Sequence, residues 1–120
     1  MKPQPRILVV DDDPDIATML SRSLSRHGFV IEATSSPKDA LERAGRTRFD
    51  AAILDLVMPE HDGAELAAAL REATPDLPIA LLTGYVRSPL LSGAERPGIG
   101  VFTKPIAIQD LVEFLQAEIR

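Results

Sequence analysis

The chain has 120 residues, of which 45% are hydrophobic, and we expect residues 1–120 to form a single folded domain. It contains no cysteine, which excludes disulfides and thiolate metal sites, and its formal net charge of −5 argues against a nucleic-acid-binding face. No apolar run has the length of a signal peptide or a membrane span, so we expect a cytoplasmic protein that does not bind a membrane.

The first part of the chain alternates apolar runs with amphipathic stretches. Residues 7–10 and 29–33 have the length and composition of buried strands. After each run a capping side chain precedes a proline, which predicts helices that begin at Asp13-Pro14 and at Ser36-Pro37. Gly28 is expected to end the first of these helices in a left-handed conformation.

The middle of the chain predicts a third strand and a third helix. Residues 51–54 are apolar, and the turn signals Met58-Pro59 and Asp62-Gly63 follow them. A helix is expected from Gly63 to the residue before Pro75. Asp55 therefore lies at the carboxyl end of a strand, which is the edge where open α/β sheets bind ligands.

The last third of the chain predicts two more strands, at residues 78–82 and 101–103. Glycine and proline crowd residues 84–100, so we expect the fourth helix to be short or irregular. An apolar stripe from Ile108 to Ile119 predicts the last helix.

Five strands that alternate with five helices favour a doubly wound α/β fold with a parallel sheet. In that fold the loops after the first, third, fourth and fifth strands meet at one edge. Polar side chains begin these loops: Asp11, Asp12 and Asp13, then Asp55, Thr83 and Lys104.

This group of side chains predicts phosphoryl chemistry. Clustered carboxylates repel one another unless a cation lies among them, and all-oxygen ligands favour Mg²⁺, which also binds phosphate. Asp55 is then the nucleophile, and the aspartates of the first loop hold the metal. Lys104 supplies a positive charge and Thr83 a hydroxyl donor for the phosphoryl oxygens.

The chain resembles the receiver domains of two-component response regulators over essentially its whole length. The resemblance lies in residues 7–12, 54–59, 82–84, Asp62-Gly63 and Lys104-Pro105. It implies a flavodoxin-like fold with strand order 2-1-3-4-5. It also implies that a sensor histidine kinase or a histidine phosphotransfer protein phosphorylates Asp55. Such a domain is a signalling protein that catalyses only its own phosphorylation and slow dephosphorylation.

The resemblance also implies a ligand set for Mg²⁺. Asp12 and Asp55 would bind the ion directly, Asp11 would act through water, and the backbone carbonyl of Val57 would be a further ligand.

Further roles follow from the same resemblance. Lys104 would bridge to Asp55 and then to the phosphoryl group, Thr83 would hydrogen-bond that group, and Lys104-Pro105 would be a cis peptide. An output partner would bind the face around the fourth and fifth helices. Phe114 lies off the apolar stripe of the last helix, and we expect it to be exposed on that face.

Two positions depart from the family pattern. Val101 stands where the family often has an aromatic switch residue, so we expect phosphorylation to order residues 85–100 instead. Val57 stands beside the position of the attacking water and cannot orient it, which predicts slow self-dephosphorylation.

Two other functions are compatible with parts of the sequence. Asp11 and Asp13 have the spacing of the nucleophile and the general acid in haloacid-dehalogenase-type phosphatases, which also use Mg²⁺. A pure interaction module, in which the aspartates only cap helices, would leave Thr83 and Lys104 without a role.

Overall fold

The computed structural model describes residues 4–58, 61–84 and 97–119. A five-stranded parallel sheet has the order β2-β1-β3-β6-β7, which confirms the predicted order of the five main strands. These strands are β1 (Arg6–Val10), β2 (Val30–Thr34), β3 (Ala51–Asp55), β6 (Ile79–Thr83) and β7 (Ile99–Thr103).

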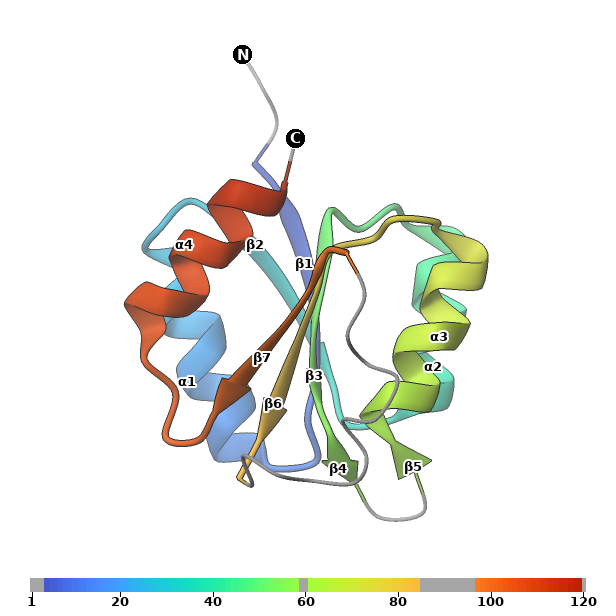
Figure 1. Ribbon diagram of the computed structural model, residues 1–120, viewed down its shortest axis with the longest axis horizontal. Helices are drawn as coiled ribbons and strands as arrows, with labels where there is room; N and C mark the ends of the chain where they lie inside the picture. Colours follow the sequence, from blue (N-terminus) through green and yellow to red (C-terminus); the bar gives the residue numbers. More distant parts are fainter. Residues whose placement is uncertain (1–3, 59–60, 85–96, 120) are drawn as a thin grey trace.

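Helices cover both faces of the sheet (Figure 1). The helices are α1 (Pro14–Ser25), α2 (Pro37–Arg46), α3 (Gly63–Ala73) and α4 (Ile108–Glu118). Helices α1 and α4 lie on one face, and α2 and α3 lie on the other. The expected short fourth helix falls largely in residues 85–96, outside the described residues.

The predicted helix starts are confirmed. The Asp13 side chain accepts a hydrogen bond from the Asp15 amide, the Ser36 side chain accepts one from Asp39, and a proline follows each cap. These bonds satisfy backbone donors that have no partner within the helix. Gly28 has a φ of 88°, as expected for a residue that ends a helix in the left-handed region.

Two hydrophobic clusters hold the helices to the sheet. Side chains alternate along a strand, so one set points to α2 and α3 and the other set to α1 and α4. In β1, Leu8 and Val10 join the first cluster, whereas Ile7 and Val9 join the second. All five residues of β3 are buried, which explains why its first four residues, 51–54, form a continuous apolar run.

A short ladder extends from the carboxyl edge of the sheet. Strands β4 (Val57–Met58) and β5 (His61–Asp62) pair antiparallel, where the sequence predicted only a turn. Figure 1 shows the pair directly below the end of β3. Two-residue strands are too short to produce a periodic signal, so the sequence could not reveal them.

The prediction that Phe114 is exposed was wrong. Phe114 is half-buried and packs edge-to-face on Phe102, with ring centroids 5.4 Å apart. Gly100 makes room for this pair, because a Cβ there would lie 2.7 Å from Cε1 of Phe114. Phe114 is therefore part of the packing of α4 on β7.

Candidate functional site

Asp55 is the last residue of β3, and its position is fixed from two sides. Its carboxylate is almost completely buried, and Oδ1 accepts a hydrogen bond of 3.3 Å from the Val57 amide. On the other side, Gly63 begins α3 against the peptide that follows Asp55. The Gly63 amide donates to the Leu56 carbonyl over 2.8 Å, and a Cβ on Gly63 would lie 2.5 Å from the Asp55 carbonyl oxygen. Only glycine permits this approach.

Asp11 and Asp12 follow β1 directly and reach the same edge. Asp11 is buried, whereas Asp12 is exposed. Oδ1 of Asp11 accepts a hydrogen bond of 2.8 Å from the Asp13 amide, but Oδ2 has no hydrogen-bond partner among the described residues. Oxygen atoms of Asp11, Asp12 and Asp55 all lie within 4.8 Å of one another.

Lys104 follows β7 and places a positive charge between the two buried carboxylates. Its Nζ lies 3.6 Å from Oδ2 of Asp11 and 3.5 Å from Oδ1 of Asp55. The Lys104 amide donates to the Thr83 carbonyl over 2.8 Å, and the Lys104-Pro105 peptide is cis, as expected. Thr83 ends β6 and is buried at the same edge.

One lysine does not fully compensate two buried carboxylates. Burial raises the pKa of Asp11. Burial and the nearby charge of Asp11 raise the pKa of Asp55. A buried carboxylate oxygen without a hydrogen-bond partner, within reach of two further carboxylates, fits a hard divalent cation such as Mg²⁺.

The raised pKa values predict that Asp55→Asn stabilises the metal-free protein. The asparagine oxygen can still accept from the Val57 amide, while one negative charge beside Asp11 is removed. In EDTA at neutral pH we expect the melting temperature to rise by about 3–5 °C, roughly 1 kcal/mol for a domain of this size. Calorimetry measures this directly.

The pH dependence follows from the direction of the shift. A carboxyl whose pKa is raised by folding destabilises the protein once it ionises, so the penalty is full above the folded pKa and disappears below the unfolded one. The advantage of Asp55→Asn should therefore shrink as the pH falls. Asp39→Asn is the control, because hydrogen bonds from Thr34 and Arg43 lower the pKa of Asp39. A higher melting temperature for Asp39→Asn, or none for Asp55→Asn, would contradict this account.

Comparison with known proteins identifies the domain. The family model for the response regulator receiver domain matches residues 7–116. The chain belongs to the response regulator receiver family. It is 38% identical over 116 residues to the response regulator MprA of Mycobacterium leprae, a match that covers 96% of this chain and 51% of MprA. The chain thus spans about half the length of the curated relatives that it matches.

Solved receiver structures have the same fold. The chemotaxis protein CheY4 of Vibrio cholerae is 30% identical with a TM-score of 0.84, and the match covers 97% of this chain and 99% of CheY4. A signal receiver domain of an HD-domain protein from Pseudomonas fluorescens is 26% identical with a TM-score of 0.86, covering 98% and 91% of the two chains. As a receiver domain, the chain is a phosphoacceptor of a two-component pathway, and the phosphatase alternative has no support.

The receiver fold brings the predicted site residues to one edge: Asp11, Asp12, Asp55, Thr83 and Lys104. Val57 lies beside them, because its backbone amide donates a hydrogen bond to Oδ1 of Asp55. Asp13 has a different role, because its carboxylate accepts from the Asp15 amide over 2.9 Å and caps α1. Sequence reasoning missed the contact of Gly63 with Asp55. The Asp62-Gly63 pair was noted as a turn signal, as a helix start and as part of the family resemblance, and apolar periodicity carries no information about such contacts.

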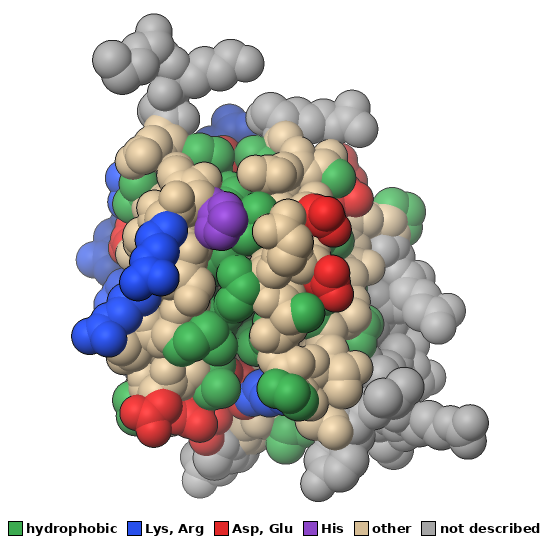
Figure 2. Space-filling model, turned by 90° about the vertical axis from the view of Figure 1, so that its left-hand side faces the viewer, with side chains coloured by type: hydrophobic (Ala, Val, Ile, Leu, Met, Phe, Trp, Pro, Cys, Tyr) green, Lys and Arg blue, Asp and Glu red, His purple; other side chains and the backbone are tan. Residues whose placement is uncertain are grey.

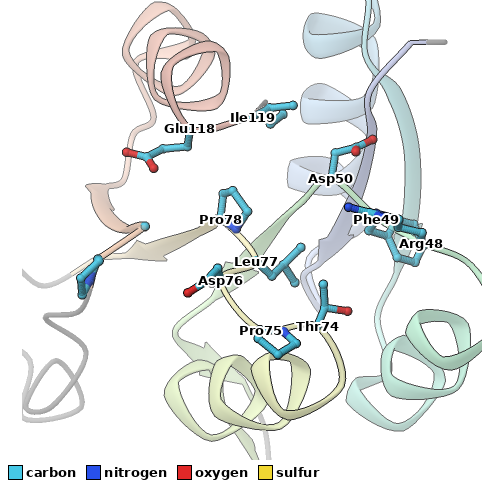
Figure 3. Close-up of a pocket in the computed structure, with 12 residues that line it drawn as sticks. Arg48, Phe49, Asp50, Thr74, Pro75, Asp76, Leu77, Pro78, Glu118 and Ile119 are labelled. Carbon is cyan, nitrogen blue, oxygen red and sulfur yellow. The ribbon is translucent and has the colours of Figure 1, made fainter. Parts of the chain in front are cut away.

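A separate cavity of about 380 Å³ lies at the opposite edge of the sheet (Figure 3). Asp50, Asp76 and Glu118 contribute acidic groups to its lining. The Asp50 carboxylate accepts a hydrogen bond of 2.8 Å from the Arg6 amide, so it has a structural role there. In the described part of the chain, no helix is long and apolar enough to span a membrane.

Proposed function

We propose that Asp55 is the phosphoacceptor and that the phosphoryl group comes from a sensor histidine kinase or a histidine phosphotransfer protein. The observation that carries the proposal is the placement of a buried Asp55 carboxylate 3.5 Å from the Lys104 ammonium, beside an Asp11 oxygen without a hydrogen-bond partner. Phosphoryl transfer requires a nucleophile, a positive charge and oxygen atoms that are available to bind a metal ion.

The proposed reaction is an in-line displacement at phosphorus. A carboxylate oxygen of Asp55 forms the new O–P bond, the N–P bond to the donor histidine breaks, and the imidazole leaves with the electron pair. Asp11, Asp12, Asp55 and the carbonyl of Val57 would hold Mg²⁺, which when bound neutralises charge on the phosphoryl oxygens.

The other residues of the site orient the transferred group. The Lys104 ammonium would move from the Asp55 carboxylate to a phosphoryl oxygen, and the Thr83 hydroxyl would donate to a second one. Through these groups the domain would catalyse its own phosphorylation and its slow dephosphorylation, without acting on another substrate.

The setting of this reaction is also a proposal. We place the domain, residues 1–120, in the cytoplasm and assign its output partner to the face around the fourth and fifth helices expected from the sequence. The last of these is α4, and the one before it falls largely outside the described residues. Val101 is 44% exposed on β7. The hypothesis that phosphorylation orders residues 85–100 concerns a segment that lies largely outside the described residues.

Transfer from a phosphorylated kinase tests the proposed function. Wild-type protein should accept the radiolabelled phosphoryl group in the presence of Mg²⁺, and EDTA should stop the transfer. Asp55→Asn should accept none, whereas Asp50→Asn at the opposite edge should accept it at the wild-type rate. Equal labelling of Asp55→Asn would contradict the assignment.

Val57 should slow the loss of the phosphoryl group. Its side chain is 50% exposed next to Asp55 and offers no hydrogen bond to an attacking water. We expect Val57→Asn to raise the rate of self-dephosphorylation by about threefold to tenfold, because an amide can orient the water. Release of inorganic phosphate measures the rate, with Val57→Ala as the control for size. An unchanged or lower rate in Val57→Asn would refute the prediction.

A further inference from the structure

Polar side chains join β2 to the start of α2. Figure 2 shows basic and acidic side chains over the outer surface of α1 and α4, but among the described residues the ion pairs outside the candidate site involve only Arg6, β2 and α2. Arg6 and Arg43 both contact Glu32 of β2, at 2.7 and 3.6 Å. Arg43 also binds the Asp39 carboxylate on α2 at 2.8 Å. The first turns of α2 are therefore tied to β2.

Asp11 depends on β2 for the position of its backbone. Strand β2 lies at the edge of the sheet, beside β1. The Asp11 amide donates to the carbonyl of Thr34, the last residue of β2, over 3.2 Å. The Asp11 carboxylate is buried, and its Oδ2 has no hydrogen-bond partner among the described residues. A displacement of the end of β2 would therefore move a carboxylate that is available to a cation.

The Thr34 side chain anchors the end of this edge strand. In the described sheet, β2 has a neighbouring strand on one side only. The Thr34 hydroxyl accepts a hydrogen bond of 3.2 Å from the Ser36 amide and donates one to the Asp39 carboxylate. Ser36 in turn caps α2, because its hydroxyl accepts from the Asp39 amide over 3.1 Å. One hydroxyl thus connects the end of β2 with the start of α2.

We propose that the Thr34 hydroxyl is a positioning group for the metal site: together with Asp39 it holds the end of β2 and, through the Thr34 carbonyl, the backbone of Asp11. The inference rests on the proposed function, in which Asp11 helps to hold Mg²⁺. Thr34 and Asp39 act through Asp11 and are not ligands themselves. Groups that orient metal ligands in this way contribute to metal affinity.

Hydrogen exchange of the Asp11 amide in EDTA tests the contact without a metal or a phosphodonor. Thr34→Val keeps the branched shape that suits a strand but removes the hydroxyl. The Asp11 amide should then exchange about tenfold faster, which is the order of effect expected when a hydrogen bond to a charged group is lost. Thr34→Ser keeps the hydroxyl and should exchange at close to the wild-type rate. NMR resolves this single amide.

Calorimetric titration with Mg²⁺ tests the consequence for the metal site. Thr34→Val should bind Mg²⁺ about threefold more weakly, a smaller loss than for a direct partner of a ligand, because the hydroxyl acts through one further peptide group. Thr34→Ser should bind Mg²⁺ as the wild type does. Asp39→Ala should lose as much affinity as Thr34→Val, and the two combined should lose no more, since both break the same bond.

Two control variants separate positioning from stability and from charge. Ile31→Val lowers stability on the same strand, because Ile31 packs against the core cluster, but it leaves Thr34 unchanged. Glu42→Ala removes an exposed carboxylate from α2, as Asp39→Ala removes a half-buried one. Both should keep the wild-type exchange rate at Asp11 and the wild-type affinity for Mg²⁺. Thermal unfolding checks that each variant is folded and compares their stabilities.

Three results would overturn the inference. The first is unchanged Mg²⁺ affinity in Thr34→Val, whether or not the Asp11 amide exchanges faster. The second is an equal loss in Thr34→Ser and Thr34→Val, which would mean that the hydroxyl has no role. The third is a loss in Ile31→Val as large as in Thr34→Val, which would make stability the cause. Wild-type protein that binds no Mg²⁺ would overturn the proposed function as well, so the two failures are distinguishable.

Discussion

Gly63→Ala is expected to lower both the stability of the protein and its rate of phosphorylation. A Cβ at this position would lie 2.5 Å from the Asp55 carbonyl oxygen and 2.9 Å from the Leu56 Cα. These are backbone atoms of the site itself, so α3 or the Asp55 peptide must shift. Overpacking of this kind costs about 1–3 kcal/mol.

The effect on phosphorylation should exceed the effect on folding. A displacement of about 1 Å in a reacting group can reduce a rate about a hundredfold. We therefore expect labelling by a small acyl phosphate to slow by about 10- to 100-fold at a temperature where the variant is fully folded. Stopped-flow or mass-spectrometric labelling measures this rate, and calorimetry measures the stability.

Gly45→Ala is the matched control for this substitution. Gly45 lies within α2 and nothing lies within 4 Å of a Cβ placed there. The added methyl group should stabilise the helix by about 1 kcal/mol and leave labelling unchanged. If Gly63→Ala were as stable and as rapidly labelled as Gly45→Ala, the close contact between α3 and Asp55 would not be needed for folding or for phosphorylation.

Lys104→Met is expected to change Mg²⁺ binding and phosphorylation in opposite directions. The Lys104 ammonium lies 3.6 Å from Asp11 and 3.5 Å from Asp55, where it would compete with a divalent cation for the same carboxylates. Its removal should raise Mg²⁺ affinity several-fold. It should also slow phosphorylation by about a hundredfold, because a donor to the developing phosphoryl charge is lost.

Calorimetric titration with Mg²⁺ and labelling with a small phosphodonor measure the two effects. Lys38→Met, on the exposed side of α2, removes the same charge away from the site and should change neither. A parallel loss of Mg²⁺ affinity and labelling in Lys104→Met would mean that the lysine supports the fold of the site. The opposite signs distinguish an electrostatic role from a structural one.

The sheet and most of its helices could be predicted because their signals are local. The apolar run of β3 and the caps at Asp13 and Ser36 need no knowledge of the tertiary contacts. The prediction that Asp55 lies beside Asp11 and Lys104 follows from topology, since parallel strands end at one edge.

The remaining features depend on contacts between distant residues. The approach of Gly63 to Asp55 and the room that Gly100 leaves for Phe114 are packing relations that no periodicity encodes. The strand pair β4–β5 consists of two residues on each side, below the length at which alternation is visible. The prediction that Phe114 is exposed was wrong because the spacing of apolar residues along the helix does not show which side chains of the neighbouring strand lie beside it.

The most direct test of the central claim is to locate the label after reaction with a small acyl phosphate and Mg²⁺. Peptide mapping by mass spectrometry should place one phosphoryl group on Asp55 in wild-type protein. Asp11→Asn should still form this label, at a reduced rate, and Asp55→Ala should form none. A stable label in Asp55→Ala, or repeated turnover that depends on Asp11, would contradict the assignment of Asp55 as the phosphoacceptor.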